Sequence, residues 1–312
     1  MANFYGSYIG YGAGGGAAGY SFPGENNGYI WGGTCPTTNK IDRVSLTSDT
    51  NATDVGDMQN SRGTATGCSS PTHGYAAGGY GGGVYSNVIE RMLFATEGNT
   101  ADVGDLSATN DNPGSCSSET HCYWLHGNTI ERISADASSA NAVDVGDSTV
   151  TYAHAAGSSD IGGGYGYIHG GYVSSTQSVY IERFQMQATA SGVDVGDLAI
   201  GAGQTGGSSS LTHGYNFGVG SAPTMSNNIQ KFIFASSASG SDIADLIQNQ
   251  WISMGVSSKT HSYSCGGDVV SGDCSHATNV IQKWPHASDT NATDIGDLTS
   301  TQNYLGPVGS QY

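Results

Sequence analysis

Short apolar runs alternate with small and polar residues along the whole chain. The clearest run, NVIERMLFA, spans residues 87–95, and YIERFQM at 180–186 and NIQKFIFA at 228–235 resemble it. These runs are rich in β-branched and aromatic residues, and Gly, Asn, Asp and Ser lie between them, as is typical of β-strands joined by turns. No apolar stripe with the 3.6-residue period of a helix lasts three turns. The pattern therefore predicts an all-β protein.

The sequence DVGD, with its variants DIAD and DIGD, marks an internal repeat. Its six copies begin at residues 54, 102, 144, 194, 242 and 294. Three other features precede most copies in order: a small-residue segment such as GCSS at 67–70, a T-H-x-Y motif, found in four repeats and exemplified at 72–75, and the apolar run, which all six share. Each repeat therefore predicts four short strands, of which DVGD forms the last.

Four-stranded units that recur every 40 to 50 residues are typical of the blades of a β-propeller. Stacked blades bury one another's faces, which gives a core to a chain poor in Leu and Ile. We therefore predict a six-bladed β-propeller with four antiparallel strands per blade; a β-solenoid is the alternative, although its repeats are usually shorter. The blades are expected at about residues 13–60, 61–108, 109–150, 151–200, 201–248 and 249–300.

The two ends of the chain lie outside this repeat. Residues 1–12 form an N-terminal arm rich in Tyr and Gly, which we expect to act in assembly. Residues 301–312 run past the sixth DVGD copy into a further strand. This strand is expected to close the ring on the first blade, with contact to a neighbouring subunit as the alternative.

The repeat also resembles known families. The order of its strands is similar to that of the kelch repeat, although DVGDL stands where kelch has a tryptophan in strand four, so the likeness implies topology only. The segments SSPTHGY, NVIER, SDTNATDVGD and SDTNATDIGDL resemble repetitive virion proteins of tailed bacteriophages, especially those of aquatic cyanobacteria.

The phage resemblance implies a role and a location. It implies a non-enzymatic structural or adhesion protein of the virion, on a tail fibre, a tail tip or as a capsid decoration. Its partners would be other virion proteins and a glycan or protein of the host surface, and a homo-oligomer is an open alternative. Synthesis in the host cytoplasm fits the start MANFYGSYIGYGAGGG, which lacks the basic and apolar regions of a signal peptide.

The charge balance excludes other classes of function. Nine Lys and Arg stand against 26 Asp and Glu, for a net charge of −17. Nucleic-acid binding is not expected, because few cations are available to displace phosphate counterions. No apolar run approaches the roughly 20 residues that a membrane span needs, so we expect no membrane insertion.

Most of the basic residues share one position of the repeat, in the apolar run. Neighbours on a strand point to opposite faces, and both faces of a blade contact other blades. Since buried charges need partners, we predict that the acid of one blade pairs with the base of the next. The acids are Asp42, Glu90, Glu131 and Glu182, and the bases that follow them in the sequence are Arg43, Arg91, Arg132 and Arg183. In the last two repeats the bases are Lys231 and Lys283, and the preceding residues are Gln230 and Gln282.

The Asp doublets permit two interpretations. Carboxylates three residues apart can share a calcium ion, with Asp54, Asp57, Asp102 and Asp105 as candidate ligands. The dense ligand pattern of an EF-hand loop is absent, however. We therefore favour a turn in which the first Asp caps the backbone, Gly takes a conformation closed to other residues, and the second Asp bonds a neighbouring blade.

The other candidate residues for chemistry are also assigned to structure. The histidines of the T-H-x-Y motif would be spread around a ring, too far apart to share one zinc, so we expect turns there. They are His73, His121, His213 and His261. No nucleophile-elbow, P-loop or HExxH motif is present. We predict no enzymatic activity, metal or cofactor; a hydrolase or oxidase on the same scaffold is the remaining alternative.

Six cysteines allow fifteen pairings. Cys265 and Cys274 flank one loop and are the pair that we single out for a bridge. We expect most of the others to be buried thiols.

Binding is expected in the loops between the second and third strands. They vary most in length and content, from NFGVGSAPTMSN to a shortened HGN in the third repeat. Loops on a rigid scaffold commonly carry recognition. The candidate binding residues are Tyr80, Tyr85, Tyr172 and Phe217, and aromatic rings among Gly, Ser and Asn suit carbohydrate or protein surfaces. A lectin-like, glycan-binding module is therefore the main alternative to a virion structural protein.

Overall fold

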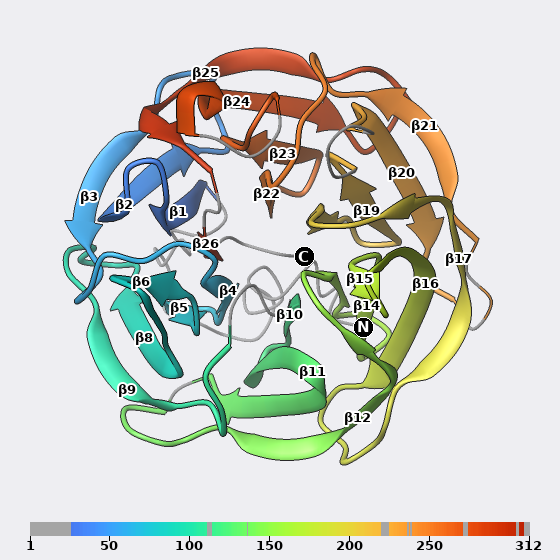
Figure 1. Cartoon of the computed structure of the whole chain (residues 1–312), viewed down its shortest axis with the longest axis horizontal. Helices are drawn as coiled ribbons and strands as arrows, with labels where there is room; N and C mark the ends of the chain where they lie inside the picture. The colour runs from blue at the N-terminus through green and yellow to red at the C-terminus, as the bar shows by residue number, and fades with distance from the viewer. Residues whose placement is uncertain are drawn as a thin grey trace, which may run out of the picture.

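Six small antiparallel sheets stand around a common axis as the blades of a β-propeller (Figure 1). The structure, a computed structural model, describes residues 26–110, 114–135, 137–219, 225–235, 237, 239–270, 274–303 and 306–308. The first strands, such as β4, β10 and β22, lie nearest the centre and the fourth strands form the outer edge. The predicted fold class is confirmed, and the solenoid alternative is excluded.

The strands of each blade follow the repeat, with the innermost strand given first here. Blade 1 has β26 (Gly306–Val308), β1 (Asn27–Gly33), β2 (Thr38–Ser45) and β3 (Thr53–Asp57). Blade 2 has β4 (Thr66–Ser69), β5 (His73–Ala77), β8 (Val88–Leu93) and β9 (Ala101–Asp105). Blade 3 has β10 (Gly114–Ser117), β11 (His121–Ser134) and β12 (Val143–Tyr152), because β11 runs through both middle positions.

The second half of the ring repeats this order. Blade 4 has β13 (Ala156–Asp160), β14 (Tyr165–His169), β16 (Thr176–Gln185) and β17 (Val193–Ala202). Blade 5 has β18 (Gly206–Ser209), β19 (His213–Phe217), β20 (Asn228–Ile233) and β21 (Ser241–Asp245). Blade 6 has β22 (Met254–Ser257), β23 (His261–Cys265), β24 (Thr278–Pro285) and β25 (Thr293–Gln302), with a short 3₁₀ turn at Cys274–His276.

The ring closes through a strand from the C-terminal end of the chain. β26 pairs antiparallel with β1, with Tyr29 opposite Val308 and Trp31 opposite Gly306. It thus takes the innermost position of blade 1. This pairing confirms the prediction that the C-terminal strand closes the ring on the first blade. The predicted N-terminal arm, and the part of the first blade expected at residues 13–25, lie outside the described residues.

The hydrophobic core lies between blades. One cluster joins Cys68, Tyr75 and Ile89 of blade 2 to Trp124 and Ile133 of blade 3, and all five are buried. Burying such faces removes apolar surface from water, which is the main favourable contribution to folding. The stability of each blade therefore depends on its two neighbours.

Small residues in the first strands allow a ring of hydrogen bonds close to the axis. The backbone N–H of one buried serine donates to the hydroxyl of the serine at the same repeat position in the next blade. Ser117 N donates to Ser159 Oγ at 2.9 Å, and Ser159 N donates to Ser209 Oγ at 2.9 Å. The same bond joins Ser69 N to Ser117 Oγ and Ser209 N to Ser257 Oγ.

At the outer edge, the DVGD segment binds the turn between strands three and four of the following blade. In blade 2, Asp102 Oδ1 accepts the N–H of Gly104 at 3.0 Å, and the N–H of Asp105 donates to Asn141 Oδ1 of blade 3 at 3.1 Å. A Cβ on Gly104 would lie 2.1 Å from the carbonyl oxygen of Ala140, so the close approach requires glycine. The first Asp therefore caps a turn, as predicted, whereas the second bonds the neighbouring blade through its backbone.

The acids of the third strands also bridge blades, but not to the bases that we predicted. Each acid or Gln instead accepts an N–H from the end of the preceding blade. Thr149 N donates to Glu182 Oε2 and Thr299 N donates to Asp42 Oδ2, both at 2.8 Å. The corresponding donors are Gln59 N for Glu90, Ser107 N for Glu131, Ile200 N for Gln230 and Ile247 N for Gln282.

The bases extend toward the other end of the blade interface, where the three–four turn of the following blade lies. Arg43 binds Glu97, in the three–four turn of blade 2, at 2.9 Å, and Arg91 Nη1 donates to the carbonyl of Ala137 at 2.8 Å. Lys231 pairs in the same way with Asp289, and Lys283 pairs with Asp49. Arg183 instead stacks on Tyr165 of its own blade. Arg132 stands in β11 at the repeat position of these bases. Acid and base therefore share an interface but lie at different ends of it, which the alternation of faces alone did not predict.

Candidate functional site

The face formed by the two–three loops and the four–one connections is built on a repeated backbone pairing. In blade 2, Gly63 N donates to Tyr80 O and Tyr80 N donates to Gly63 O. In blade 4, Ala153 and Tyr172 make the same reciprocal pair. Blades 1 and 6 repeat it between Thr34 and Asn303 and between Trp251 and Asp268. Tyr80 and Tyr172 thus occupy equivalent positions, each held against the connection that enters its blade.

Tyr80 and Tyr85 lie together on a small hairpin that extends from blade 2. The hairpin consists of β6 (Tyr80–Gly81) and β7 (Val84–Tyr85), joined through Gly82 and Gly83 at positive φ. The two tyrosine rings are 4.9 Å apart, and Val84 and Tyr85 are 67% and 51% exposed. Exposed apolar residues gathered on one short element are candidates for a contact surface.

Two clefts open on this face, at equivalent places of blades 2 and 4. The larger has a volume of about 750 Å³ and lies between the connection Val150–His154 and residues 172–175 of blade 4. The smaller, of about 440 Å³, lies between Asn60–Arg62 and the hairpin of blade 2. In the larger cleft the rings of His154 and Tyr172 meet edge to face, with centroids 6.2 Å apart.

Phe217 does not belong to this surface. It is the last residue of β19, its side chain is completely buried, and its ring packs against Trp284 of blade 6 with centroids 4.8 Å apart. Its assignment as a binding-loop residue is therefore wrong. The repeat contained a signal for this, because the equivalent residues Ala77 and Cys265 are the last of their strands and are also buried.

The histidines of the T-H-x-Y motif are the first residues of the second strands, and they close the turns before those strands, which agrees with the predicted turn role. In the turn between β4 and β5, the N–H of His73 donates to Ser70 Oγ at 3.0 Å, and Thr72 Oγ1 contacts His73 Nδ1 at 2.8 Å. The other three histidines repeat this geometry: His121, His213 and His261. Burial, with Arg132, Lys231 or Lys283 nearby, lowers the pKa of these three imidazoles.

The aspartates of the calcium alternative remain separate. Asp54 and Asp102 each use one carboxylate oxygen to accept the N–H of the glycine two residues on. Asp57 and Asp105 make their contacts to the next blade through backbone groups. Among the residues that the structure describes, no group of three or more His, Cys, Asp or Glu side chains is placed to hold a metal ion.

One buried cluster has the residue types of a catalytic triad. Ser158 Oγ lies 2.9 Å from His169 Nε2, and His169 Nδ1 lies 3.0 Å from Asn216 Nδ2. Ser158 Oγ donates its proton to the carbonyl of Ser208 at 2.9 Å, and all three side chains are completely buried. Burial lowers the pKa of His169 to about 3. A nucleophile must be reached by its substrate, so this cluster serves to join blades 4 and 5.

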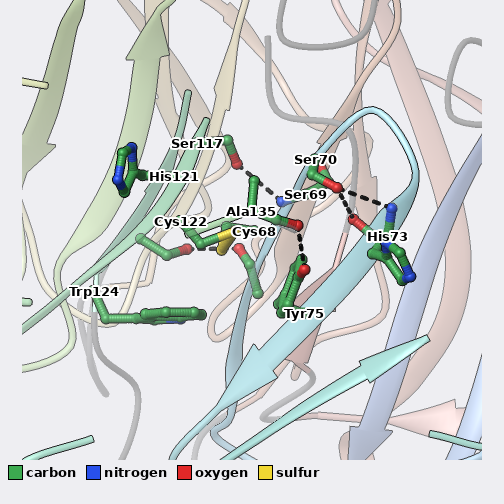
Figure 2. Close-up of a disulfide and its surroundings, with 12 residues drawn as sticks. Cys68, Ser69, Ser70, His73, Tyr75, Ser117, His121, Cys122, Trp124 and Ala135 are labelled. Carbon is green, nitrogen blue, oxygen red and sulfur yellow. Dashed lines mark hydrogen bonds between the residues drawn. A yellow bond between two sulfur atoms is a disulfide. The ribbon is translucent and has the colours of Figure 1, made fainter. Parts of the chain in front are cut away.

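The disulfide between Cys68 and Cys122 was not predicted. It joins β4 of blade 2 to β11 of blade 3, beside the bond from Ser69 to Ser117 and the bond from Tyr75 to Ala135 (Figure 2). Cys35 is also disulfide-bonded. Cys116 and Cys265 are buried free thiols, so the proposed Cys265–Cys274 bridge is wrong.

The same cross-blade contact recurs without a disulfide. Blades 5 and 6 carry Ser208 and Ser262 at the positions of Cys68 and Cys122, and Ser208 Oγ donates to Ser262 Oγ at 2.8 Å. An alignment of the repeats shows that these positions are equivalent, but only the structure shows that they are in contact.

Comparison with known proteins adds no family. No protein-family model matches this sequence, and a search of curated proteins finds no significant match. No helix in the described ranges is long and apolar enough to cross a membrane. The functional argument therefore depends on the geometry of the loop face.

Proposed function

We propose that this protein is a non-enzymatic virion component of a tailed bacteriophage that attaches to its partner through the loop face. The observation that carries the proposal is the hairpin with Tyr80, Val84 and Tyr85, which presents three exposed apolar side chains from a rigid ring. The resemblance of the repeat to phage virion proteins supports the same role. The ring itself is well suited to a particle, since hydrogen bonds join its blades both near the axis and at the outer edge.

The distribution of reactive side chains supports a non-catalytic role. The motif histidines are held in turns, and the cluster of Ser158, His169 and Asn216 is sealed from solvent. A disulfide between blades is typical of proteins that work in an oxidising environment, such as a particle released from its host.

Two measurements test the role. Mass spectrometry of purified particles should detect this protein at a fixed ratio to the capsid protein, and it should resist washing with high salt. The isolated protein should also compete with particles for adsorption to host cells. Replacing Tyr85 by Ala should weaken whichever of these contacts uses the hairpin, whereas replacing the exposed Ser48, in the three–four turn of blade 1, should change neither. Absence from particles would contradict the proposal.

A glycan-binding module is the second candidate. It is favoured by exposed tyrosines on a face otherwise rich in Gly, Ser and Asn, because sugar rings stack their C–H faces on aromatic rings and their hydroxyls bond small polar groups. Binding to immobilised glycans in the absence of any other virion protein would distinguish this function from a purely assembling one.

A further inference from the structure

The shortened third repeat leaves one part of the loop face uncovered. In blade 4, the two–three loop covers the connection that follows it: a Cβ on Gly203 would lie 2.4 Å from the ring of Tyr172, and one on Gly201 would lie 3.3 Å from Gln177 O. In blade 3 no such loop exists, because β11 continues from His121 to Ser134. The positions equivalent to Gly201 and Gly203 are Thr151 and Ala153, and both are exposed.

The larger cleft is the result of this missing loop. Gly127, at φ +60, is the residue of β11 that pairs with Tyr152, and a Cβ there would meet only the Thr151 methyl group, at 3.9 Å. The floor of the cleft is thus Val150–His154, the uncovered end of β12 and the two residues after it, and the wall is the loop of blade 4. Its volume of about 750 Å³ falls in the range of small-molecule sites.

The lining of the cleft is uncharged. None of the residues at 150–154 and 172–175 is Asp, Glu, Lys or Arg. Tyr152 forms part of the floor, and its hydroxyl donates a hydrogen bond to the buried Glu182 at 2.8 Å. In a protein with a net charge of −17, an anionic ligand would be repelled and would find no cation in the cleft. A cationic ligand would find no carboxylate in the lining.

The groups that remain suit a sugar. Tyr172 is half-buried, and its ring is held between the backbone pair with Ala153 and the contact with Gly203. Ser174 and Ser175 are exposed on the wall and Thr151 on the floor. Ser174 and Ser175 have positive φ as the two central residues of the tight turn between Val173 and Thr176, which holds them at the edge of the cleft.

We propose that this cleft binds an uncharged glycan, with a pyranose ring stacked on Tyr172 and its hydroxyls bonded to Thr151, Ser174 and Ser175. The proposal rests on the glycan-binding function above and assigns it to one place in the ring. The site is single because the third repeat is the one whose two–three loop is reduced to HGN. The other cleft, beside the hairpin of blade 2, differs in its lining: it has the exposed Val84 and Tyr85 and the buried Arg62, whose guanidinium pairs with Glu90 at 3.2 Å.

The test uses immobilised uncharged oligosaccharides of glucose, galactose, mannose and N-acetylglucosamine, with sialylated and uronic-acid-containing oligosaccharides as the charged set. The full-length protein should bind one or more of the uncharged set. Tyr172→Ala should raise the Kd by about tenfold or more, because aromatic anchors dominate binding energy. Tyr172→Phe should retain most of the affinity. Ile233→Ala, which removes an exposed apolar side chain at the end of β20 in blade 5, is the control and should leave the Kd unchanged.

A second variant tests the missing loop directly. Replacing Gly127 by the blade 4 segment 172–177 should cover Thr151 and Ala153 and abolish binding, while thermal unfolding shows that the ring is intact. Glycan binding that survives both Tyr172→Ala and the loop insertion overturns the cleft assignment but leaves glycan binding in place. Binding to no glycan, or to the charged set alone, overturns the proposal, and adsorption of particles through this protein would then still support the virion role.

Discussion

Replacing the disulfide between blades 2 and 3 by a pair of serines tests how the ring is held together. The double variant Cys68→Ser with Cys122→Ser recreates the arrangement of Ser208 and Ser262, whose hydroxyls are hydrogen-bonded at 2.8 Å. The variant therefore removes the covalent link while keeping a contact that the same fold already uses. Its effect on stability should report the cross-link and little else.

The magnitude follows from the length of chain that the bridge closes. The two cysteines are 54 residues apart, and closing a loop of that length lowers the entropy of the unfolded chain by an amount worth about 4 kcal/mol. A serine–serine hydrogen bond returns about 1 kcal/mol. We therefore expect a net loss of about 3 kcal/mol, which lowers Tm by about 5 °C in a chain of this size.

Differential scanning calorimetry with and without a reductant measures this effect. The oxidised wild type should melt above the variant, and reduction should lower the Tm of the wild type more than that of the variant. The response that remains in the variant belongs to the bridge of Cys35. Equal melting of the oxidised wild type and the variant would refute the argument. The reverse change, Ser208→Cys with Ser262→Cys, should raise Tm under oxidising conditions.

Three further substitutions test other contacts between neighbouring blades. Ser159→Ala leaves the buried N–H of Ser117 without its acceptor and should cost about 1–3 kcal/mol in urea unfolding. Gly104→Ala places a methyl group against the carbonyl of Ala140 and should cost a similar amount, about 1–3 kcal/mol. His169 has a folded pKa of about 3, below its ordinary 6.5, so the unfolded state binds the proton first and stability is lost as pH falls from 6.5 toward 3. His169→Phe should therefore flatten the pH dependence of the urea midpoint over that range, while lowering stability at pH 7.

The controls are residues that take no part in these three contacts. Ser48→Ala removes an exposed hydroxyl that bonds Ser45, in its own turn, and Gly162→Ala adds a methyl group whose nearest neighbour is 3.9 Å away, so both should unfold nearly like the wild type. Part of the acid sensitivity should survive in His169→Phe, because burial also lowers the pKa of His286, to about 4. An unchanged pH profile in that variant, or equal losses in the controls, would show that the assigned contacts are not the cause.

The repeat made the fold predictable, because it fixed the number of blades and the order of strands without any contact information. It also predicted the turns of His73 and Asp102, since Ser, Thr, Asp and Gly bond to local backbone in known ways. The partners of Glu182 could not be predicted, because they include a backbone N–H of another blade, and backbone groups carry no sequence signal. Phe217 was misplaced because it was assigned to its variable loop, although it stands four residues after the motif histidine, as the apolar Ala77 and Cys265 do in blades 2 and 6.

The candidate cleft was only partly predictable. Tyr172 was singled out from its variable loop, but the binding surface depends equally on Thr151 and Ala153, which have no unusual chemistry. They are exposed because the two–three loop of blade 3 is shortened to HGN and does not cover them. Its effect on the next blade appears only when the connections are placed side by side.

The position of β26 has a consequence for biosynthesis. This strand is translated after every other strand of the ring, yet it covers the inner edge of β1, one of the first to emerge. The nascent chain therefore passes through an open, crescent-shaped intermediate with an unpaired edge, and such edges recruit strands from other chains. Chaperone demand and the yield of monomer should accordingly be decided when β26 emerges from the ribosome, and a variant that lacks β26 should give linked multimers in place of closed rings.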